Sequence, residues 1–143
     1  MPQTFDTSRR VEFRDTDSAG LMHFTAFFTK MEEVEHEFLR SLGTSVVVYE
    51  GDSKLSWPRV KASCDYQGGT RFEDELTVQL SILRLGTKSV TYGFTFTRGE
   101  KSIATGEMTS VYCRFDSGKP PQALQVPADL AQKMSVYVVE SAE

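Results

Sequence analysis

The sequence has few of the residues on which large classes of active site depend. Its 143 residues include only two histidines, two cysteines and one tryptophan. Two cysteines without a CxxC spacing form neither a disulfide framework nor a cysteine zinc site. The motifs GxSxG, GxGxxG, GxxxxGK[ST] and HExxH are absent. These absences argue against a serine triad, a dinucleotide or phosphate loop and a bound metal.

Long apolar runs and excess positive charge are also missing. No run approaches the roughly 20 apolar residues that span a bilayer, and the N-terminal residues lack a secretory signal pattern. The chain has 16 basic and 20 acidic residues, for a net charge of -4. This balance argues against nucleic acid as a partner, because binding to phosphate backbones needs a basic surface. We therefore expect a cytoplasmic protein with no membrane or nucleic-acid partner.

No repeat or linker divides the chain, so residues 1–143 are expected to form a single domain.

One strong helical pattern lies between Gly20 and Gly43. Apolar residues recur there at spacings of three and four, and Gly43 follows them where a left-handed cap ends a helix. The apolar stripe consists of Phe24, Phe27, Phe28, Met31, Val34, Phe38 and Leu42. The opposite face carries Lys30, Glu32, Glu33, Glu35, Glu37 and Arg40. We expect this charged face to meet solvent or another subunit.

Most of the remaining chain alternates with period two, which is typical of strands with one covered face. The pattern predicts a short strand over 10–13 before the helix. Four further strands follow it, over 57–66, 75–85, 89–98 and 102–115. Short glycine turns between these strands favour an antiparallel meander. The sequence thus predicts an α+β fold with an antiparallel five-stranded sheet wrapped around one long central helix.

Candidate chemistry is concentrated just before this helix, where Asp15 and Asp17 precede a loop of small residues that ends at Gly20. The first turn of a helix leaves backbone N–H groups unpaired, and its dipole adds positive potential. Such groups can polarise a carbonyl and stabilise an oxyanion. Asp17 is then placed to attack as a nucleophile or to act as a general base. An aspartate at this position can equally cap the helix, which is worth about 1 kcal/mol. The local pattern leaves both roles open for Asp17 and favours a structural role for Asp15.

The segment 11–24, VEFRDTDSAGLMHF, and the helix end LRSLG resemble the 4-hydroxybenzoyl-CoA thioesterase family. The segments WPRV at 57–60, RFEDEL at 71–76 and Lys88-Ser89 occur in the same order as in this family. The resemblance implies a hotdog fold that forms homodimers and homotetramers, and hydrolysis of an acyl-CoA to a free acid and CoA. It implies that Asp17 is the catalytic carboxylate and that an N–H near Phe24 polarises the thioester. CoA is part of the substrate, so no separate cofactor is expected.

Two departures from the family pattern bear on the mechanism. Many members have an aromatic residue followed by histidine, with an asparagine two residues later. This chain has His23 followed by Phe24, and Ala26 in the later position. His23 and Asp17 can therefore be interpreted as the pair of a hotdog enoyl-CoA hydratase. A non-catalytic acyl-CoA or acyl-carrier binding module is the third possibility, and a histidine bonded only to the backbone is the simplest role for His23.

An acidic protein that binds CoA must gather basic groups near the phosphates. Several basic residues lie near the ends of the later predicted strands, and among them we expect Arg84 and Lys88, with Ser89, to contact CoA. Trp57 and Tyr66 are interpreted as packing or interface residues. One helix cannot cover both faces of five strands, so we also expect the sheet to pair with another subunit.

Overall fold

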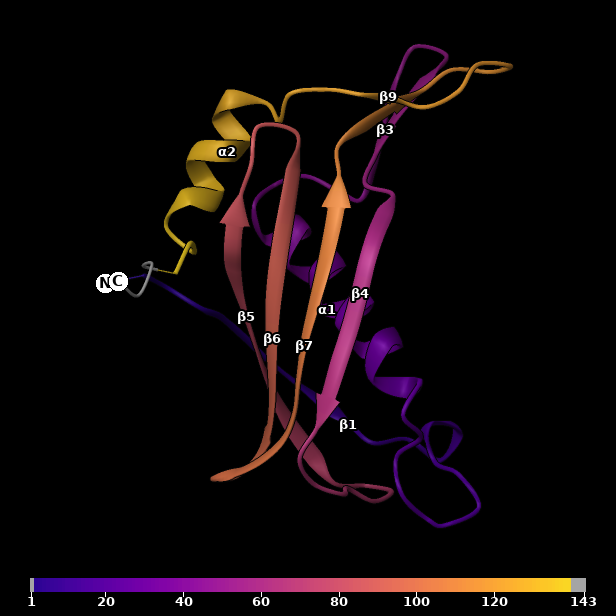
Figure 1. The fold of residues 1–143 in the computed structure, drawn as a ribbon, viewed down its shortest axis with the longest axis vertical. Helices are drawn as coiled ribbons and strands as arrows, with labels where there is room; N and C mark the ends of the chain where they lie inside the picture. The colour runs from indigo at the N-terminus through magenta and orange to yellow at the C-terminus, as the bar shows by residue number, and fades with distance from the viewer. Residues whose placement is uncertain (1, 140–143) are drawn as a thin grey trace.

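A computed structural model describes residues 2–139 and contains a five-stranded antiparallel sheet curved around one long helix (Figure 1). The strand order is β1-β5-β6-β7-β4, with β1 and β4 at the edges. The strands are β1 (Phe5–Arg10), β4 (Arg59–Tyr66), β5 (Glu75–Leu85), β6 (Ser89–Arg98) and β7 (Lys101–Val111), and the helix is α1 (Ala26–Ser41). The central helix and the five-stranded sheet agree with the sequence prediction, and β5 and β6 have the predicted bounds.

A second, smaller sheet and a second helix were not expected from the sequence. The smaller sheet has the order β2-β3-β8-β9 and extends beyond one end of the main sheet (Figure 1). Its strands are β2 (Val47–Glu50), β3 (Ser53–Ser56), β8 (Cys113–Phe115) and β9 (Gln122–Ala123). The second helix, α2 (Ala128–Ser135), lies beside the end of β5. The predicted strand 102–115 is therefore two strands in two different sheets.

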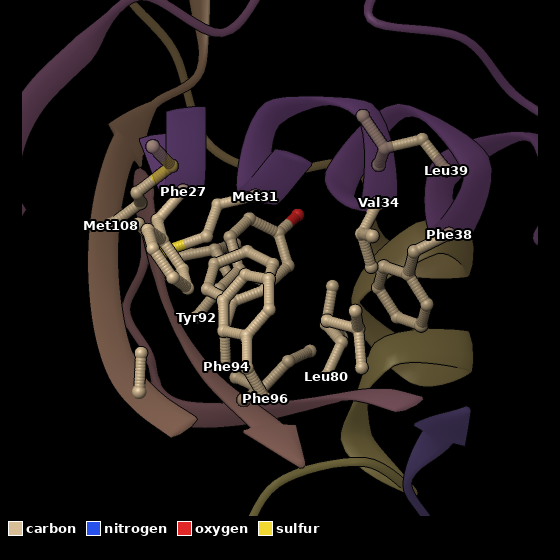
Figure 2. Packing of buried hydrophobic residues seen from close by; sticks show 14 of the residues in the cluster. Phe27, Met31, Val34, Phe38, Leu39, Leu80, Tyr92, Phe94, Phe96 and Met108 are labelled. Atoms are coloured by element: carbon tan, nitrogen blue, oxygen red, sulfur yellow. The ribbon is translucent and has the colours of Figure 1, made fainter. Parts of the chain in front are cut away.

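The core forms between the apolar stripe of α1 and the inner face of the sheet (Figure 2). Alternate residues of β5 and β6 are buried there because successive side chains of a strand point to opposite faces. Gly106 on β7 allows the close approach of the helix, since a Cβ at this position would lie 2.3 Å from the sulfur of Met31. The tight packing fixes the start of α1 relative to the neighbouring sheet ends, and these together frame the site described below.

The chain before α1 differs from the prediction. Residues 10–13 do not form a strand, because β1 ends at Arg10 and a 3-10 turn, η1 (Phe13–Asp15), follows. A reciprocal capping box between Glu12 and Asp15 stabilises this turn. The helix begins only at Ala26, so Phe24 lies outside it and is 59% exposed instead of buried in the core.

The charged face of α1 is not uniformly exposed, which corrects the sequence prediction. Lys30 and Glu35 are both buried, at 4% and 1% exposure. Each has a charged partner from another part of the chain, which makes the burial tolerable. The C-terminal end of α1 follows the prediction, because Gly43 has the left-handed φ of 86° that a helix cap requires.

Among residues 2–139, no helix is long and apolar enough to cross a membrane. Cys64 and Cys113 are both free thiols, and Cys113 is buried.

Candidate active site

The loop that carries Asp17 is closed by backbone hydrogen bonds. The Asp17 N–H donates to the Leu21 carbonyl at 2.9 Å, and the Gly20 N–H donates to the Asp17 carbonyl at 3.0 Å. Gly20 has a φ of 80°, a conformation that costs glycine little and side-chain-bearing residues much more. Gly20 therefore shapes the turn that presents Asp17.

The Asp17 carboxylate is tied to its loop through one oxygen only. Its Oδ1 accepts hydrogen bonds from the N–H groups of Ala19 at 2.9 Å and Leu21 at 3.4 Å. Within residues 2–139, no group donates to Oδ2. The position that caps α1 is occupied by Thr25, so Asp17 is not the N-cap of the helix. One carboxylate oxygen thus holds the geometry while the other remains available for chemistry.

Asp17 lines a cavity of about 450 Å³ at the start of α1. The opposite wall comes from the connection between β4 and β5. The lining residues are Asp17, Leu21, Met22, Phe24, Phe27, Tyr66, Gln67, Gly68, Gly69 and Thr70. The predicted pair Asp17 and Phe24 is therefore brought together in one cavity, whose walls are largely apolar around a single acidic side chain.

Phe24 lines the same cavity, and its backbone offers a donor. The His23 N–H donates to the Asp15 carbonyl at 2.7 Å, and the Ala26 N–H donates to the His23 carbonyl at 3.0 Å. The Phe24 N–H between them has no acceptor within the described part of the chain. An unpaired N–H in the turn before a helix is suited to polarising a bound carbonyl.

A buried ion pair supports the loop from behind. Lys30 Nζ lies 3.2 Å from Asp15 Oδ2, and both side chains are at least nine-tenths buried. The same Asp15 oxygen accepts the Glu12 N–H at 2.8 Å. Asp15 therefore joins the chain before the loop, the chain after it and the second turn of α1, in agreement with the structural role inferred from the sequence.

Neither His23 nor Gly20 lines the cavity, although the sequence placed both in the site. The His23 ring stacks on the Phe24 ring with centroids 4.6 Å apart. Its Nδ1 lies 2.6 Å from the hydroxyl of Thr25 and accepts the Thr25 N–H at 3.2 Å. These contacts hold the His23 ring within the turn before α1.

Tyr66 is the site residue that sequence reasoning missed. It was interpreted as a packing or interface residue, but it lines the cavity at the end of β4. Its hydroxyl donates to the Phe24 carbonyl at 2.8 Å. Desolvation, with a smaller contribution from the neighbouring Cys64, raises the pKa of Tyr66 to about 12, so the phenol keeps its proton at neutral pH. In the sequence, the Gly68-Gly69 turn marks the end of the strand that carries Tyr66.

Basic residues are found at both ends of the sheet, but those preferred in the sequence analysis lie far from the cavity. Arg84, Lys88 and Ser89 surround the β5–β6 turn beside α2, whereas the Asp17 loop lies at the opposite end of the sheet (Figure 1). At the cavity end, Arg98 donates to the Gly69 carbonyl at 3.0 Å, and Lys101 packs against Gly68. A single chain therefore does not bring the predicted CoA-binding residues to Asp17.

A second polar cluster lies further along α1, on the side of β4. Glu35 forms an ion pair with Arg59 and accepts the Ser110 hydroxyl at 3.1 Å. Burial raises the pKa of Glu35, although Arg59 and Ser110 oppose this shift. The hydroxyl of Tyr92 is buried without a partner among residues 2–139, and Figure 2 shows it pointing toward α1. No set of three His, Cys, Asp or Glu side chains in the described chain is arranged to hold a metal ion.

Comparison with known proteins identifies the family. The model of the thioesterase-like superfamily matches residues 11–134. A candidate esterase of Aquifex aeolicus is 30% identical over 125 residues, which cover 85% of this chain and 95% of that protein. A 1,4-dihydroxy-2-naphthoyl-CoA hydrolase of Synechococcus is 29% identical over 106 residues, with 71% of each chain covered. The structure of a gentisyl-coenzyme A thioesterase superposes with a TM-score of 0.78 at 26% identity, covering 91% of this chain and 99% of that one.

The curved sheet around a central helix is thus the hotdog fold of thioesterases. The chain belongs to the thioesterase-like superfamily and is a thioester hydrolase. The resemblance noted in the sequence is confirmed at the level of this superfamily.

Proposed function

We propose that the protein hydrolyses an aromatic acyl-CoA to the free acid and CoA, with Asp17 as the catalytic carboxylate. The single observation that carries this proposal is the position of Asp17. Asp17, with its free Oδ2, and Phe24, with its unpaired N–H, both line a cavity of about 450 Å³. This volume lies within the range of roughly 300–1,000 Å³ that is typical of small-molecule sites.

The Phe24 N–H binds the thioester oxygen and stabilises the negative charge that develops on it. Asp17 Oδ2 then attacks the carbonyl carbon, which forms a mixed anhydride and expels the CoA thiolate, and water hydrolyses the anhydride. Alternatively, Asp17 removes a proton from a water molecule that attacks the same carbon. Both routes use the same carboxylate and end with the free acid and CoA. Neither route requires a metal or a separate cofactor.

The substrate class follows from the relatives and the cavity walls. The names of two relatives contain an aromatic acyl group, naphthoyl in one and gentisyl in the other. In this chain, Phe24 and Phe27 contribute aromatic rings and Leu21 and Met22 contribute aliphatic surface. Aromatic rings pack favourably against such side chains. We therefore propose an aromatic acyl group over a short aliphatic one.

The hydratase alternative has less support. It needs the His23 imidazole to activate water together with Asp17. The His23 ring is instead engaged with Thr25 and Phe24 and is not part of the cavity lining. Replacement of His23 by alanine is accordingly expected to affect hydrolysis less than replacement of Asp17.

The test measures hydrolysis of a panel of aromatic and aliphatic acyl-CoAs, with release of free thiol as the readout. Asp17→Asn is expected to lower kcat at least about a hundredfold, because it removes the base or nucleophile. Asp52→Asn, an exposed aspartate in the β2–β3 turn, serves as the matched control and should behave like the wild type. A loss in Asp17→Asn of less than about tenfold, roughly 1.4 kcal/mol, contradicts the assigned role. Tight binding of an uncleavable analogue without any thiol release identifies a binding module instead.

We also propose that the protein is a homodimer or homotetramer in the cytoplasm. In support, β4 is an eight-residue edge strand, most of whose residues are exposed, including Val60 at 63%. Unpaired edges of this kind are normally covered in native proteins. Contacts of Arg84, Lys88 and Ser89 with CoA would then have to come from another subunit. A monomeric mass at micromolar concentration contradicts this proposal.

A further inference from the structure

Two basic residues lie beside the cavity wall formed by the connection between β4 and β5. Arg98 ends β6 and Lys101 begins β7, and the two residues pair with each other at the turn between these strands. Both side chains contact glycines of the connection, and these glycines line the cavity. The site described above uses neither cation.

The Lys101 side chain lies against the cavity wall at Gly68. A Cβ at Gly68 would lie 3.2 Å from Lys101 Cε, so the missing side chain of the glycine makes room for the lysine. Lys101 is exposed, and its ammonium group has no carboxylate partner among residues 2–139. Its charge is therefore available to a ligand that extends past the wall.

The Arg98 guanidinium is held through one nitrogen. Its Nη1 donates to the Gly69 carbonyl at 3.0 Å and to Asp74 Oδ2 at 3.2 Å. Its other nitrogens have no acceptor within the described part of the chain, and the side chain is 34% exposed. A guanidinium carries five N–H donors in a planar fork that matches the oxygens of a phosphate. Arg98 is thus an oriented cation with donors left for an anion.

Two carboxylates near this turn oppose a bound anion to different degrees. Asp74 is engaged by Arg98 and also accepts the Thr70 hydroxyl at 2.9 Å. Glu100, in the turn itself, forms no ion pair within residues 2–139, so it does not occupy the Lys101 ammonium. Its charge still weakens the attraction of an anion, and its removal therefore tests the site with the opposite sign.

We propose that Lys101 and Arg98 form the subsite for the phosphates of CoA. This inference rests on the proposed function, because it takes CoA as the carrier of the acyl group. An acidic protein attracts a polyanion only where it gathers basic groups, and Arg and Lys bind phosphate oxygens by charge-assisted hydrogen bonds.

The position of these cations fits the shape of CoA. The pantetheine arm separates the thioester from the phosphates, so cations that bind the phosphates have to lie beyond the cavity and not beside Asp17. The β4–β5 connection lies between the two sites: a Cβ at Gly69 would meet Leu21 of the Asp17 loop at 3.3 Å, whereas Gly68 faces Lys101. Figure 1 shows the Asp17 loop and the β6–β7 turn at the same end of the sheet, on either side of this connection.

The experiment compares Lys101→Met with the wild type on two substrates that share one acyl group: the acyl-CoA, and the acyl-pantetheine, which lacks the phosphates. Methionine keeps the stem against Gly68 and removes the charge. We expect KM for the acyl-CoA to rise about fivefold. We expect kcat to stay within about twofold of the wild type, because a contact remote from the reacting atoms binds substrate and transition state equally. The kinetics with acyl-pantetheine should be unchanged, and added salt should reduce the difference seen with acyl-CoA.

Two further variants complete the comparison. Glu100→Gln should lower KM for the acyl-CoA about twofold and leave the acyl-pantetheine unaffected. Lys119→Met is the matched control, because Lys119 is exposed in the connection between β8 and β9, at the other end of the molecule. It should behave like the wild type on both substrates.

Three results overturn the inference. The first is a wild-type KM for the acyl-CoA in Lys101→Met, and the second is an equal rise of KM for both substrates. The third is a rise that appears in Lys88→Met instead of Lys101→Met, which places the phosphates at the β5–β6 turn.

Binding of free CoA, measured by calorimetry, separates this inference from the proposed function. If CoA binds about fivefold more weakly to Lys101→Met than to the wild type but no thioester is cleaved, the subsite stands and the proposed function fails. If Asp17→Asn is inactive while Lys101→Met matches the wild type in every assay, the proposed function stands and the subsite is rejected. If the wild type neither binds CoA nor cleaves a thioester, both are rejected.

Discussion

Two carboxylates close to the central helix have opposite environments. Asp17, in the loop before α1, is exposed, lines a cavity and has one oxygen without a donor. Glu35, midway along α1, is 1% exposed, and Arg59 and Ser110 occupy both of its oxygens. A carboxylate must be accessible to the substrate to act on it. A buried carboxylate whose oxygens are both paired within the protein stabilises the fold instead. We propose that position relative to a cavity distinguishes the reactive acid, Asp17, from the structural acid, Glu35.

The largest expected effect is on the stability of the Glu35 region. Glu35→Ala removes the buried partner of the Arg59 guanidinium and leaves it only the exposed Glu32, and breaking a buried pair typically costs about 3–5 kcal/mol. We expect a loss of this size in the free energy of unfolding, measured by urea denaturation. The folded fraction should keep its kcat, because Glu35 is not at the Asp17 cavity.

Glu32→Ala provides the control for that experiment. Glu32 also pairs with Arg59, at 3.3 Å, but its side chain is 51% exposed. Exposed ion pairs contribute about 0–1 kcal/mol, so Glu32→Ala should have little effect. Equal losses in the two variants would show that burial of Glu35 does not matter to the fold.

The next effect concerns the ion pair between Lys30 and Asp15, which supports the loop that carries Asp17. Lys30→Met keeps the length of the side chain but leaves the Asp15 carboxylate buried without its cation. We expect a loss of about 3 kcal/mol in the free energy of unfolding. We also expect a lower kcat in the folded protein, because Asp15 holds the turn that precedes Phe24. This second effect distinguishes Lys30 from Glu35.

Lys133→Met is the matched control for Lys30→Met. Lys133 Nζ donates to the Leu42 carbonyl at an exposed position. Its replacement should change neither kcat nor stability by a large amount. If Lys30→Met is stable but catalyses at the wild-type rate, the loop does not depend on the Asp15–Lys30 pair.

The smallest effect is a pH dependence at His36, beside Glu35. Burial lowers the pKa of His36 below its ordinary value of 6.5, although the nearby Glu32 opposes this shift. The unfolded chain therefore takes up a proton near pH 6.5, whereas the folded protein does so only at lower pH. Stability contributed by this residue is lost as the pH falls below 6.5.

His36→Gln removes this titration. The difference in unfolding free energy between the wild type and His36→Gln should decrease as the pH is lowered from 7 through 6.5. A difference that stays constant with pH, or that increases toward acid, contradicts the assigned shift.

The fold was largely predictable because its main elements have strong local patterns. The alternation in most of β5 and β6 follows burial, and the predicted apolar stripe is largely buried from Phe27 onward, whereas Phe24 is exposed. β2 was missed because all four of its residues are exposed and have no buried face to give a period. The helix α2 was missed because it is short and buries only Leu130 and Met134.

The site was only partly predictable, because its remaining features depend on contacts between distant segments. Asp17 and Phe24 are close in sequence, so a local motif could indicate both. The burial of Lys30 depends on Asp15, and that of Glu35 depends on Arg59 and Ser110, which a helical period does not reveal. Tyr66 similarly reaches the site only because β4 ends beside the start of α1.

The most direct test of the account is a crystal structure with an uncleavable analogue of the preferred acyl-CoA, in which a methylene replaces the thioester sulfur. We predict that its carbonyl oxygen lies within hydrogen-bonding distance of the Phe24 N–H and that its carbonyl carbon faces the Asp17 carboxylate. A carbonyl bound away from both groups, for example beside Glu32 and Arg59, would contradict the assignment of Asp17 as the catalytic residue.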